Sequence, residues 1–229
     1  MFAPNQFKKS TFELDLHPVY LPFWTFDMNC YTRYSARRGD YVYVTVTKVD
    51  RDGNRYTDRE REIRWSFRTG HCTNKFDDVL VLGSKNHTNR AHINKICNFD
   101  FNNLEKFNPK FLIGYAGEKI SLPLEEGFKQ AKENVQLEIE RSIKWQVGGD
   151  EVRILTCDTD YTDVTFKQIL VPIYNGIYNY RGKQYSFAMN GQNSKVAGGY
   201  PVSGIKVFFF VLSIVVILLA FILFVTSIA

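Results

Sequence analysis

Three side chains able to transfer protons lie within eight residues of one another. His71, Asp77 and Asp78 could form an acid–base set in which an imidazole and a carboxylate share a substrate proton. Acidic residues at the start of a strand more often bond the backbone or face solvent than do chemistry. The run FDDVLVL from Phe76 to Leu82 is such a strand pattern. We therefore expect these residues to have a structural role.

Metal and nucleotide sites are no better supported by the spacing. His87 and His92 lack a third and a fourth ligand nearby, and the string GYAGEK at residues 114–119 lacks the spacing and the Ser/Thr of a nucleotide-binding loop. The sequence thus predicts no metal, no cofactor and no enzymatic activity, with an unrecognised hydrolase as a second alternative. The cysteines show no CxxC pair, so isolated thiols are expected, although a disulfide stays open. They are Cys30, Cys72, Cys97 and Cys157.

Arginines are concentrated between Arg51 and Arg68. Asp52-Gly53-Asn54 is typical of a tight turn, and the alternating segments on both sides of it predict a hairpin. Cations mixed with aromatic rings are typical of nucleic-acid surfaces, but acidic residues are interleaved here and leave only a small positive excess. We predict a solvated strand face whose charges pair with one another. Arg64 and Arg68 are the candidate interaction surface on it, for an acidic partner or for lipid headgroups.

One helix and several strands would have to position these residues. The segment Leu124–Val147 predicts a helix, because apolar residues recur every three or four positions and Gly148-Gly149 follows as a stop. A short helix is expected at residues 92–97. Strands are expected at residues 41–49, 55–67, 76–82, 151–158, 165–180, 184–189 and 195–197, and residues 165–180 form either one long strand or a bent pair.

Two strand-like segments resemble each other. YLPFW at residues 20–24 and LVPIY at residues 170–174 each contain a proline, and each is followed by tyrosines and then by a glycine turn, at Gly39 and Gly182. A proline inside a strand implies a bulge or a sheet edge. These segments either arose by duplication or are similar by chance. The predicted fold class is α+β, with antiparallel β-units, duplicated or not, packed around one long helix.

The segment Val207–Ala229 has no charged residue and reads VFFFVLSIVVILLAFILFVTSIA. As a helix it would span about 34 Å, which exceeds the hydrocarbon core of a bilayer at about 30 Å. The hydroxyls of Ser213, Thr226 and Ser227 can bond to the helix backbone, so they do not forbid insertion. The sequence therefore predicts a soluble α+β domain at residues 1–200, a short linker at 201–206 and a transmembrane helix at 207–229.

Positive charge precedes this apolar segment. Lys206 flanks the expected membrane anchor, and Arg181, Lys183 and Lys195 lie upstream. Positive charge favours the cytoplasmic side or its equivalent, such as a matrix or stroma. The net charge of +5 also suits anionic headgroups. We expect a single-pass membrane protein with its soluble part on that side, and the mitochondrial inner membrane is one setting.

Several motifs in this order resemble the C-terminal part of an uncharacterised, mostly bacterial protein family. Members of that family carry an N-terminal zinc ribbon, then an α+β region, then a membrane segment. The resemblance covers the chain from about Phe2 onward, but no cysteine here matches the ribbon's pairs, so the helicase-like or transcription-factor-like labels of some members do not transfer. The motifs are YLPFWTFDMNCYTRYS, FDDVLVLGS, LPLEEGFKQAKE, YTDVTFKQILVPIYNGIYNYRGKQYSFAMNGQNSKVAGGYP and the apolar tail.

These observations favour a non-catalytic accessory or scaffold subunit of a membrane protein complex, with a respiratory complex as one example. The expected partners are the lipid bilayer and other membrane subunits, and nucleic acid is disfavoured. The alternative is a membrane-tethered module that binds nucleic acid or a ligand. Homo-oligomerisation is not decided by the sequence.

Overall fold

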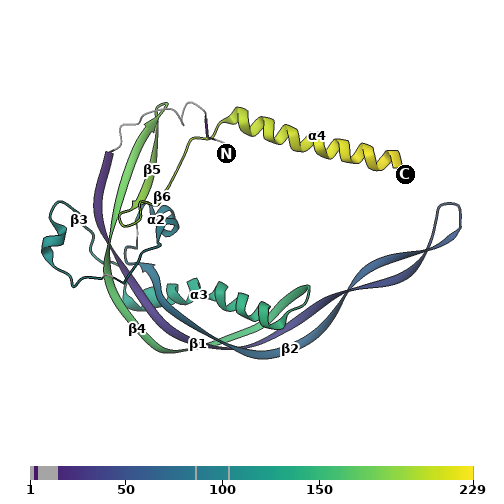
Figure 1. Cartoon of the computed structure of the whole chain (residues 1–229), viewed down its shortest axis with the longest axis horizontal. Coiled ribbons are helices and arrows are strands. Elements are labelled where there is room, and N and C mark those ends of the chain that lie inside the picture. Colours follow the sequence, from purple (N-terminus) through teal and green to yellow (C-terminus); the bar gives the residue numbers. More distant parts are fainter. Residues whose placement is uncertain (1–2, 5–14, 86, 103, 229) are drawn as a thin grey trace. The chain divides into compact units, whose positions relative to one another are not determined.

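The computed structural model describes residues 3–4, 15–85, 87–102 and 104–228, with side chains described up to residue 222. Figure 1 labels the elements along the chain. In chain order they are β1 (Asp15–Val49), β2 (Arg55–Leu82), α2 (Arg90–Ile96), the 3-10 helix η1 (Pro109–Leu112), β3 (Ala116–Gly117), α3 (Leu124–Val147), β4 (Glu151–Tyr180), β5 (Lys183–Asn190), β6 (Val196–Gly198) and α4 (Gly204–Ile228).

The strands form one sheet in the order β2-β1-β4-β5-β6, and the short strand β3 pairs with β1. The β1–β3 pairing is parallel, while the β1–β2, β4–β5 and β5–β6 pairings are antiparallel. The chain divides into two compact units, to which β1 and β4 both contribute. Unit 1 comprises Met1–Leu21, Asn86–Lys119 and Val171–Ala229, and unit 2 comprises Pro22–Lys85 and Ile120–Leu170.

The β1–β2 hairpin is the longest ladder of unit 2. Its register runs from Val49 opposite Arg55 to Phe23 opposite Leu82, with one shift between Phe26 and Met28. At the turn, Gly53 has φ of 85° and its N–H donates to the Asp50 carbonyl at 3.2 Å. Glycine adopts this positive φ without steric cost. The predicted hairpin is confirmed.

Two predicted strand breaks are wrong. Residues 55–67 and 76–82 belong to the single strand β2, and residues 151–158 and 165–180 belong to the single strand β4. The expected turn at Gly39 is also absent, because Gly39 lies inside β1 opposite Trp65. A Cβ at Gly39 would meet the Trp65 ring at 3.0 Å, so an aromatic side chain fills the space that the glycine leaves.

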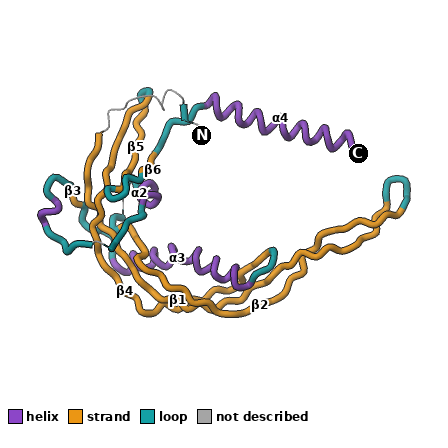
Figure 2. Tube along the Cα trace, in the orientation of Figure 1, coloured by secondary structure: helices purple, strands orange, loops and turns teal. Residues whose placement is uncertain are grey.

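The helix predicted at Leu124–Val147 has those bounds in the structure. It ends at Gly148, whose φ is 63° and whose N–H donates to the Lys144 carbonyl at 3.0 Å. Phe128 is half-buried, with its ring 5.5 Å from that of Phe26. The helix covers one face of the unit 2 sheet, so the expected arrangement of strands around a helix is not the observed one (Figure 2). Its buried residues are Gly127, Ala131, Val135, Ile139, Ile143 and Val147.

Unit 1 is organised around a buried amide. The Asn190 side chain is 1% exposed, and its Nδ2 donates to the carbonyls of Ile96 at 2.9 Å and Asn98 at 3.3 Å. Its Oδ1 accepts from the N–H groups of Gln192 and Asn193. Asn190 thereby satisfies carbonyls that the end of α2 leaves without helical partners. The short helix expected at 92–97 corresponds to α2, at Arg90–Ile96.

The α4 helix carries the apolar C-terminal segment. From Gly204 to Ile222 its mean hydropathy is 3.0, and none of this stretch is buried within the structure. It is therefore long and apolar enough to cross a membrane. The Ser213 hydroxyl donates to the Phe210 carbonyl at 2.7 Å, as expected for a polar residue inside such a helix. The side chains of Thr226 and Ser227 lie outside the described residues.

Replacing Ile139 by alanine tests the contact between helix and sheet. Ile139 is fully buried, so we expect Ile139→Ala to lower the free energy of unfolding by about 2–5 kcal/mol through lost burial and the cavity left behind. Lys129→Ala on the exposed side of α3 should change it by less than about 0.5 kcal/mol. Chemical denaturation of the full chain in mild detergent, followed by circular dichroism, measures both. Equal loss in the two variants would contradict the assigned buried face.

Candidate functional site

The β1–β2 hairpin continues beyond its neighbours as a two-stranded ribbon (Figure 1). The ladder has eight further pairs past Tyr41, from Val42 opposite Glu62 to Val49 opposite Arg55. The third strand, β4, begins at Glu151, whose carboxylate accepts a hydrogen bond from the Tyr41 hydroxyl at 3.2 Å. We call the segment of residues 42–62 the ribbon. An isolated pair of strands is only marginally stable in water. Contacts between side chains must therefore stabilise the ribbon.

The two faces of the ribbon carry opposite charges. Successive side chains of a strand point to opposite faces, and residues directly opposite in an antiparallel ladder share a face. The acidic residues Asp58, Glu60 and Glu62 therefore share one face, while Arg59 and Arg61 share the other. The charges interleave in the sequence but separate in space. We call the second surface the arginine face, and it consists of Tyr43, Thr45, Thr47, Val49, Arg55, Thr57, Arg59 and Arg61.

Asp58 and Glu60 on the acidic face pair within the chain, as the sequence predicted. Lys48 Nζ lies 2.7 Å from both Asp58 Oδ2 and Glu60 Oε1. The hydrogen bond from Lys48 holds the pKa of the Asp58 carboxyl below its usual value. In contrast, the described residues offer no ion-pair partner to Arg55 or Arg59 on the other face. The prediction of self-paired charges thus holds for one face of the ribbon only.

Aromatic contacts complete the arginine face. The Arg61 guanidinium lies 4.3 Å from the centre of the Tyr41 ring, a cation–π contact. Tyr43 is 71% exposed and directly opposite Arg61. The face therefore offers planar donors beside exposed rings, a combination enriched at the energetic centres of protein interfaces.

Arg64 and Arg68, the residues selected from the sequence, lie elsewhere on β2. Both are exposed, opposite Asp40 and Ala36, on the face that carries the acidic row and on which α3 packs further along. Across the described ranges, neither side chain has an ion-pair partner. The structure does not place these two arginines together with Arg59 and Arg61. The alternation of strand side chains was the signal that could have separated the two groups.

Lys206, selected as the flank of the membrane anchor, lies in the first turn of α4. Its Nζ donates to the Ala3 carbonyl at 2.7 Å, within unit 1. The side chain is half-buried. This contact places a cation at the start of the apolar helix, where the sequence expected it.

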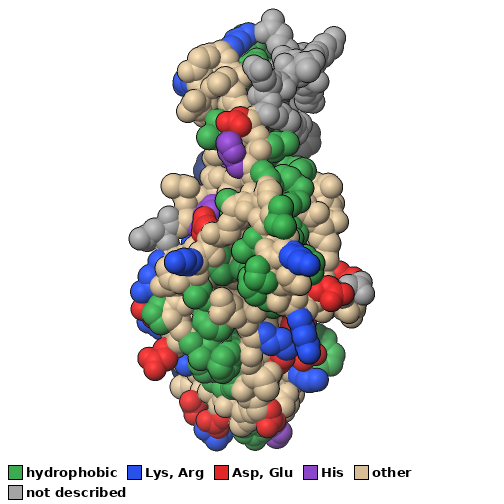
Figure 3. Space-filling view, turned by 90° about the vertical axis from the view of Figure 1, so that its left-hand side faces the viewer, with side chains coloured by type: hydrophobic (Ala, Val, Ile, Leu, Met, Phe, Trp, Pro, Cys, Tyr) green, Lys and Arg blue, Asp and Glu red, His purple; other side chains and the backbone are tan. Residues whose placement is uncertain are grey.

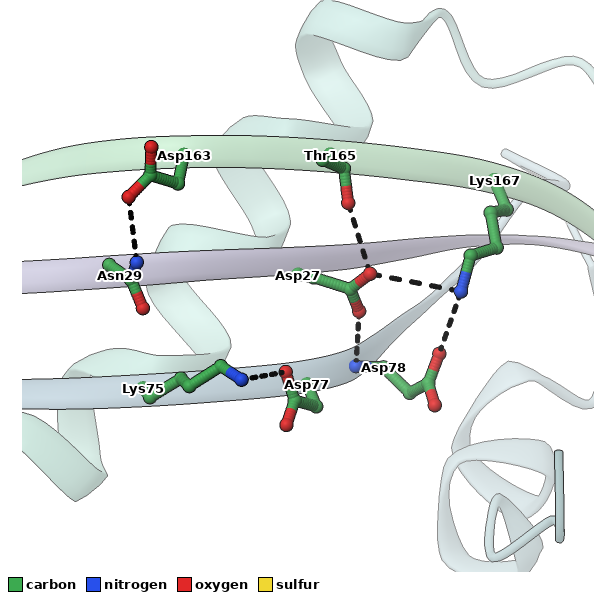
Figure 4. Close-up of polar contacts among 8 residues, drawn as sticks. All are labelled: Asp27, Asn29, Lys75, Asp77, Asp78, Asp163, Thr165 and Lys167. Atoms are coloured by element: carbon green, nitrogen blue, oxygen red, sulfur yellow. Dashed lines mark hydrogen bonds and ion pairs between the residues drawn. The ribbon is translucent and has the colours of Figure 1, made fainter. Parts of the chain in front are cut away.

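A polar cluster surrounds Asp27 at the register shift of β1 (Figure 4). Its carboxylate accepts hydrogen bonds from the Asp78 backbone N–H at 2.8 Å and the Thr165 hydroxyl at 3.0 Å. Lys167 Nζ lies 3.7 Å from Asp27 and 3.8 Å from Asp78. Asp78 has φ of 54°, a left-handed conformation that Asp tolerates better than most residues. The cluster thus fixes a bulge between strands.

The acid–base set considered from the sequence is not assembled. His71 and Asp77 lie six residues apart on β2, about 20 Å along a strand. The His71 ring packs 5.3 Å from the Tyr31 ring, and Asp77 forms an ion pair with Lys75. The hydrogen bond from Asp78 lowers the pKa of the Asp27 carboxyl, which is the opposite of what a general acid needs.

The other chemistry-bearing residues are also separate. His87 pairs with Glu118 at 3.4 Å, and no three His, Cys, Asp or Glu residues in the described ranges are grouped to hold a metal. The four cysteines are free thiols. Burial, together with the neighbouring Cys72, raises the pKa of the Cys30 thiol to about 11, so it is a poor nucleophile at neutral pH.

A groove of about 400 Å³ lies between α3 and β2 in unit 2. Trp145 at its border is 86% exposed, and Arg141 beside it pairs with Glu138 at 3.1 Å. Arg141 is the one charged residue among those that line it. Its lining residues are Cys72, Thr73, Arg141, Ser142, Trp145 and Gln146.

Charged and apolar side chains are mixed elsewhere on the surface. In the face shown in Figure 3, Lys and Arg side chains lie among Asp and Glu, with hydrophobic side chains between them. No continuous patch of like-charged side chains covers that face. That face therefore shows no separation of charge like that on the ribbon.

Comparison with known proteins gives a distant relative. The chain is 24% identical over 216 residues to the uncharacterized protein YdjG of Bacillus subtilis (strain 168). The match covers 90% of this chain and 58% of that protein, so the chain spans little more than half the length of this relative. No family model matches the chain, and no solved structure matches it.

Replacing Asp27 tests the bulge cluster. Asp27→Ala should lower the free energy of unfolding by about 1–2 kcal/mol at pH 7, because the Asp78 N–H loses its acceptor. The folded-state pKa of Asp27 is depressed, so its contribution is present above the unfolded value and is lost as pH falls through the folded one.

Denaturation from pH 7 to pH 2 measures this effect. The stability difference between wild type and Asp27→Ala should shrink below about pH 4. Asp27→Asn is the control, since its amide oxygen can still accept from Asp78 but does not titrate. A difference between wild type and Asp27→Ala that stays constant with pH would show that the charge of Asp27 contributes nothing.

Proposed function

We propose that this protein is a non-catalytic, single-pass membrane protein that acts as an accessory or scaffold subunit of a membrane protein complex. The observation that carries the proposal is the arginine face of the ribbon. Arg55 and Arg59 are exposed without ion-pair partners in the described part of the chain, and Tyr43 beside them is largely exposed. Such a surface suits an acidic segment of another subunit.

The energetics of the ribbon support a docking role. Among the described residues, neither a third strand nor the helix α3 lies beside its eight pairs, since β4 starts at Glu151 and α3 ends at Val147. A partner that covers one face would bury the Val49 and Tyr43 side chains and supply carboxylates to the arginines. Charge pairs at the rim of such an interface mainly set encounter rate and specificity.

The apolar helix α4 is the proposed anchor. Its length and composition suit a bilayer, and Lys206 in its first turn suits the headgroup region. The soluble part would lie on the cytoplasmic side or its equivalent, with the mitochondrial inner membrane as one setting. Tethering to a membrane also raises the local concentration of other membrane subunits around the ribbon.

Two further proposals concern ancestry. The ordered motifs resemble the zinc-ribbon membrane family, and the 24% identical relative is longer than this chain. Duplication of a β-unit is supported by two matching contacts. The Gly83 N–H donates to the Pro22 carbonyl at 2.8 Å, and the Gly191 N–H donates to the Pro172 carbonyl at 2.9 Å. In each unit a strand-interior proline thus accepts a bond from the glycine that follows the partner strand.

The alternative is a membrane-tethered module that binds nucleic acid. A two-stranded ribbon fits a major groove, and arginines beside tyrosines suit phosphates and bases. The two proposals differ in salt dependence. Nucleic-acid affinity would fall linearly with salt on logarithmic axes, with a slope set by the number of phosphates contacted, and Arg59→Gln/Arg61→Gln would reduce that slope.

Removing charge from the arginine face tests the scaffold proposal. The full chain, purified in gentle detergent, should retain the same membrane subunits in fixed stoichiometry. Arg59→Gln/Arg61→Gln should reduce their recovery at least about fivefold, because two charge-assisted contacts are lost. Lys129→Gln/Lys144→Gln removes the same charge from exposed positions of α3 and should change nothing. Equal recovery in all three would exclude the arginine face as the docking site.

Deleting residues 206–229 tests the anchor. The remaining chain should leave the membrane fraction and stay folded and monodisperse without detergent, because the stretch Gly204–Ile222 of α4 has no buried residues. Fractionation followed by circular dichroism checks both points. A fragment that aggregates or unfolds would show that the apolar segment belongs to the core of unit 1.

A further inference from the structure

β2 is an edge strand whose backbone groups face outward at known positions. The Tyr41 N–H donates to the Asp150 carboxylate at 2.7 Å, and the Gly39 carbonyl accepts from the Asp150 N–H at 2.9 Å. These β1 groups therefore point away from β2. Antiparallel pairs alternate between bonded and non-bonded, so Ile63 and Trp65, which lie opposite them, direct their own N–H and C=O groups to the open edge.

The unpaired N–H and C=O groups of an edge strand can bond to a strand of another chain, and charged side chains usually prevent such pairing. On β2 the charges are ordered by sign around Ile63. On one face the acidic residues Asp58 and Glu62 precede it, and the basic residues Arg64 and Arg68 follow it. Glu62 and Arg64 have no ion-pair partner among the residues that the structure describes. The edge is therefore complementary to itself when reversed.

We propose that two copies of this chain pair through β2, edge to edge and antiparallel, with the two-fold axis at Ile63. The occupant of the open edge is a second copy of the chain, because the charges on the edge of β2 are complementary to those of the same edge in reverse. This inference does not depend on the proposed scaffold function. It continues the sheet across two chains, with the outward N–H and C=O groups of Ile63 bonding those of its symmetry mate.

In this register four charged residues around Ile63 face an opposite charge. Glu62 of one copy lies opposite Arg64 of the other, and the two-fold axis makes this pair twice. Asp58 lies opposite Arg68 in the same way. On the other face, Arg61 lies opposite Trp65, and Arg59 lies opposite Phe67, which is 62% exposed in the single chain. Cross-strand pairs of opposite charge, and cations over rings, both stabilise a sheet.

Neighbouring registers lack this match. A two-fold axis at Glu62 places two glutamates opposite each other, and one at Arg64 places two arginines opposite each other. An axis at Trp65 places Glu62 opposite Arg68 but leaves Arg64 opposite Ser66, with no charge to pair. The Ile63 register is thus the one in which both Glu62 and Arg64 find partners.

In the same register, the second copy would occupy the groove beside α3. It places Gly53 of the second copy opposite Thr73, so the hairpin turn of each chain reaches the groove of the other. Arg141 and Trp145 border this groove, and the turn carries Asp50 and Asp52. The 86% exposed Trp145 would then be covered by the second copy.

Complementing charge variants tests the pairing. The full chain in detergent micelles should form dimers in sedimentation equilibrium. Glu62→Arg and Arg64→Glu should each raise the dissociation constant at least about tenfold, because each reversal turns two opposite-charge pairs into like-charge pairs. An equimolar mixture of the two variants should regain the wild-type constant, since the pairs are restored between unlike copies. Lys129→Glu is the matched control and should not change the constant.

Either of two results would overturn the proposal. One is a wild-type chain that stays monomeric across the concentration range. The other is a mixture that associates as weakly as the single variants. The mixture result is independent of folding artefacts, because a variant that had unfolded could not regain association by mixing.

A disulfide test fixes the register. Glu60 and Ser66 lie opposite each other only when the axis is at Ile63, whereas within one chain they are six residues apart on a strand, about 20 Å. Glu60→Cys/Ser66→Cys should form an intermolecular disulfide under mild oxidation. Glu60→Cys alone and Ser66→Cys alone should match the wild-type background. Cross-linking by a single variant, or none by the double variant, would refute the Ile63 register.

Discussion

The β1–β2 ladder imposes one alternation of side chains on most of unit 2. It runs from Phe23 opposite Leu82 to Val49 opposite Arg55 with a single register shift. Because successive side chains change face, a slip of the whole pairing by one residue would move its apolar residues to the wrong side. The cluster at Asp27 holds the one point where the register does shift, through the hydrogen bond from the left-handed Asp78. The buried side and the charged faces both depend on that ladder.

α3 depends on the same alternation. The buried β1 residues Cys30, Tyr34 and Ala36 share one face of the strand and belong to the same hydrophobic cluster as the buried residues of α3. That row ends near Gly39, where α3 also ends and Gly149 packs against Arg38. Beyond this point the ladder continues without a hydrophobic layer. Its order there rests on cross-strand contacts such as Lys48 with Asp58 and Glu60, which are modest in solvent.

Sequence reasoning predicted those elements whose signals are local. The α3 helix has both its apolar period and its glycine stop within its own residues, and the hairpin turn has its Asp-Gly-Asn signature. It missed the continuity of β1, because Gly39 looks like a turn until the ring of Trp65 is known to cover it. It also divided β2 and β4, each of which is a single strand. It also missed the Asp27 cluster, whose partners come from three strands distant in sequence. The arginine face was not predicted, because the charges were counted along the chain and were not assigned to the two faces of the strand.

The charges on the edge strand β2 have a different meaning when they are grouped by face. Counted as composition, Asp58 to Arg68 has alternating acids and arginines that would simply repel a neighbouring strand. On one face of β2 the acidic residues precede Ile63 and the arginines follow it. On the other face, the arginines would lie opposite Trp65 and Phe67 of an antiparallel second copy. This order favours the register centred on Ile63 over its neighbours, so charge on an edge strand can specify a partner as well as prevent one.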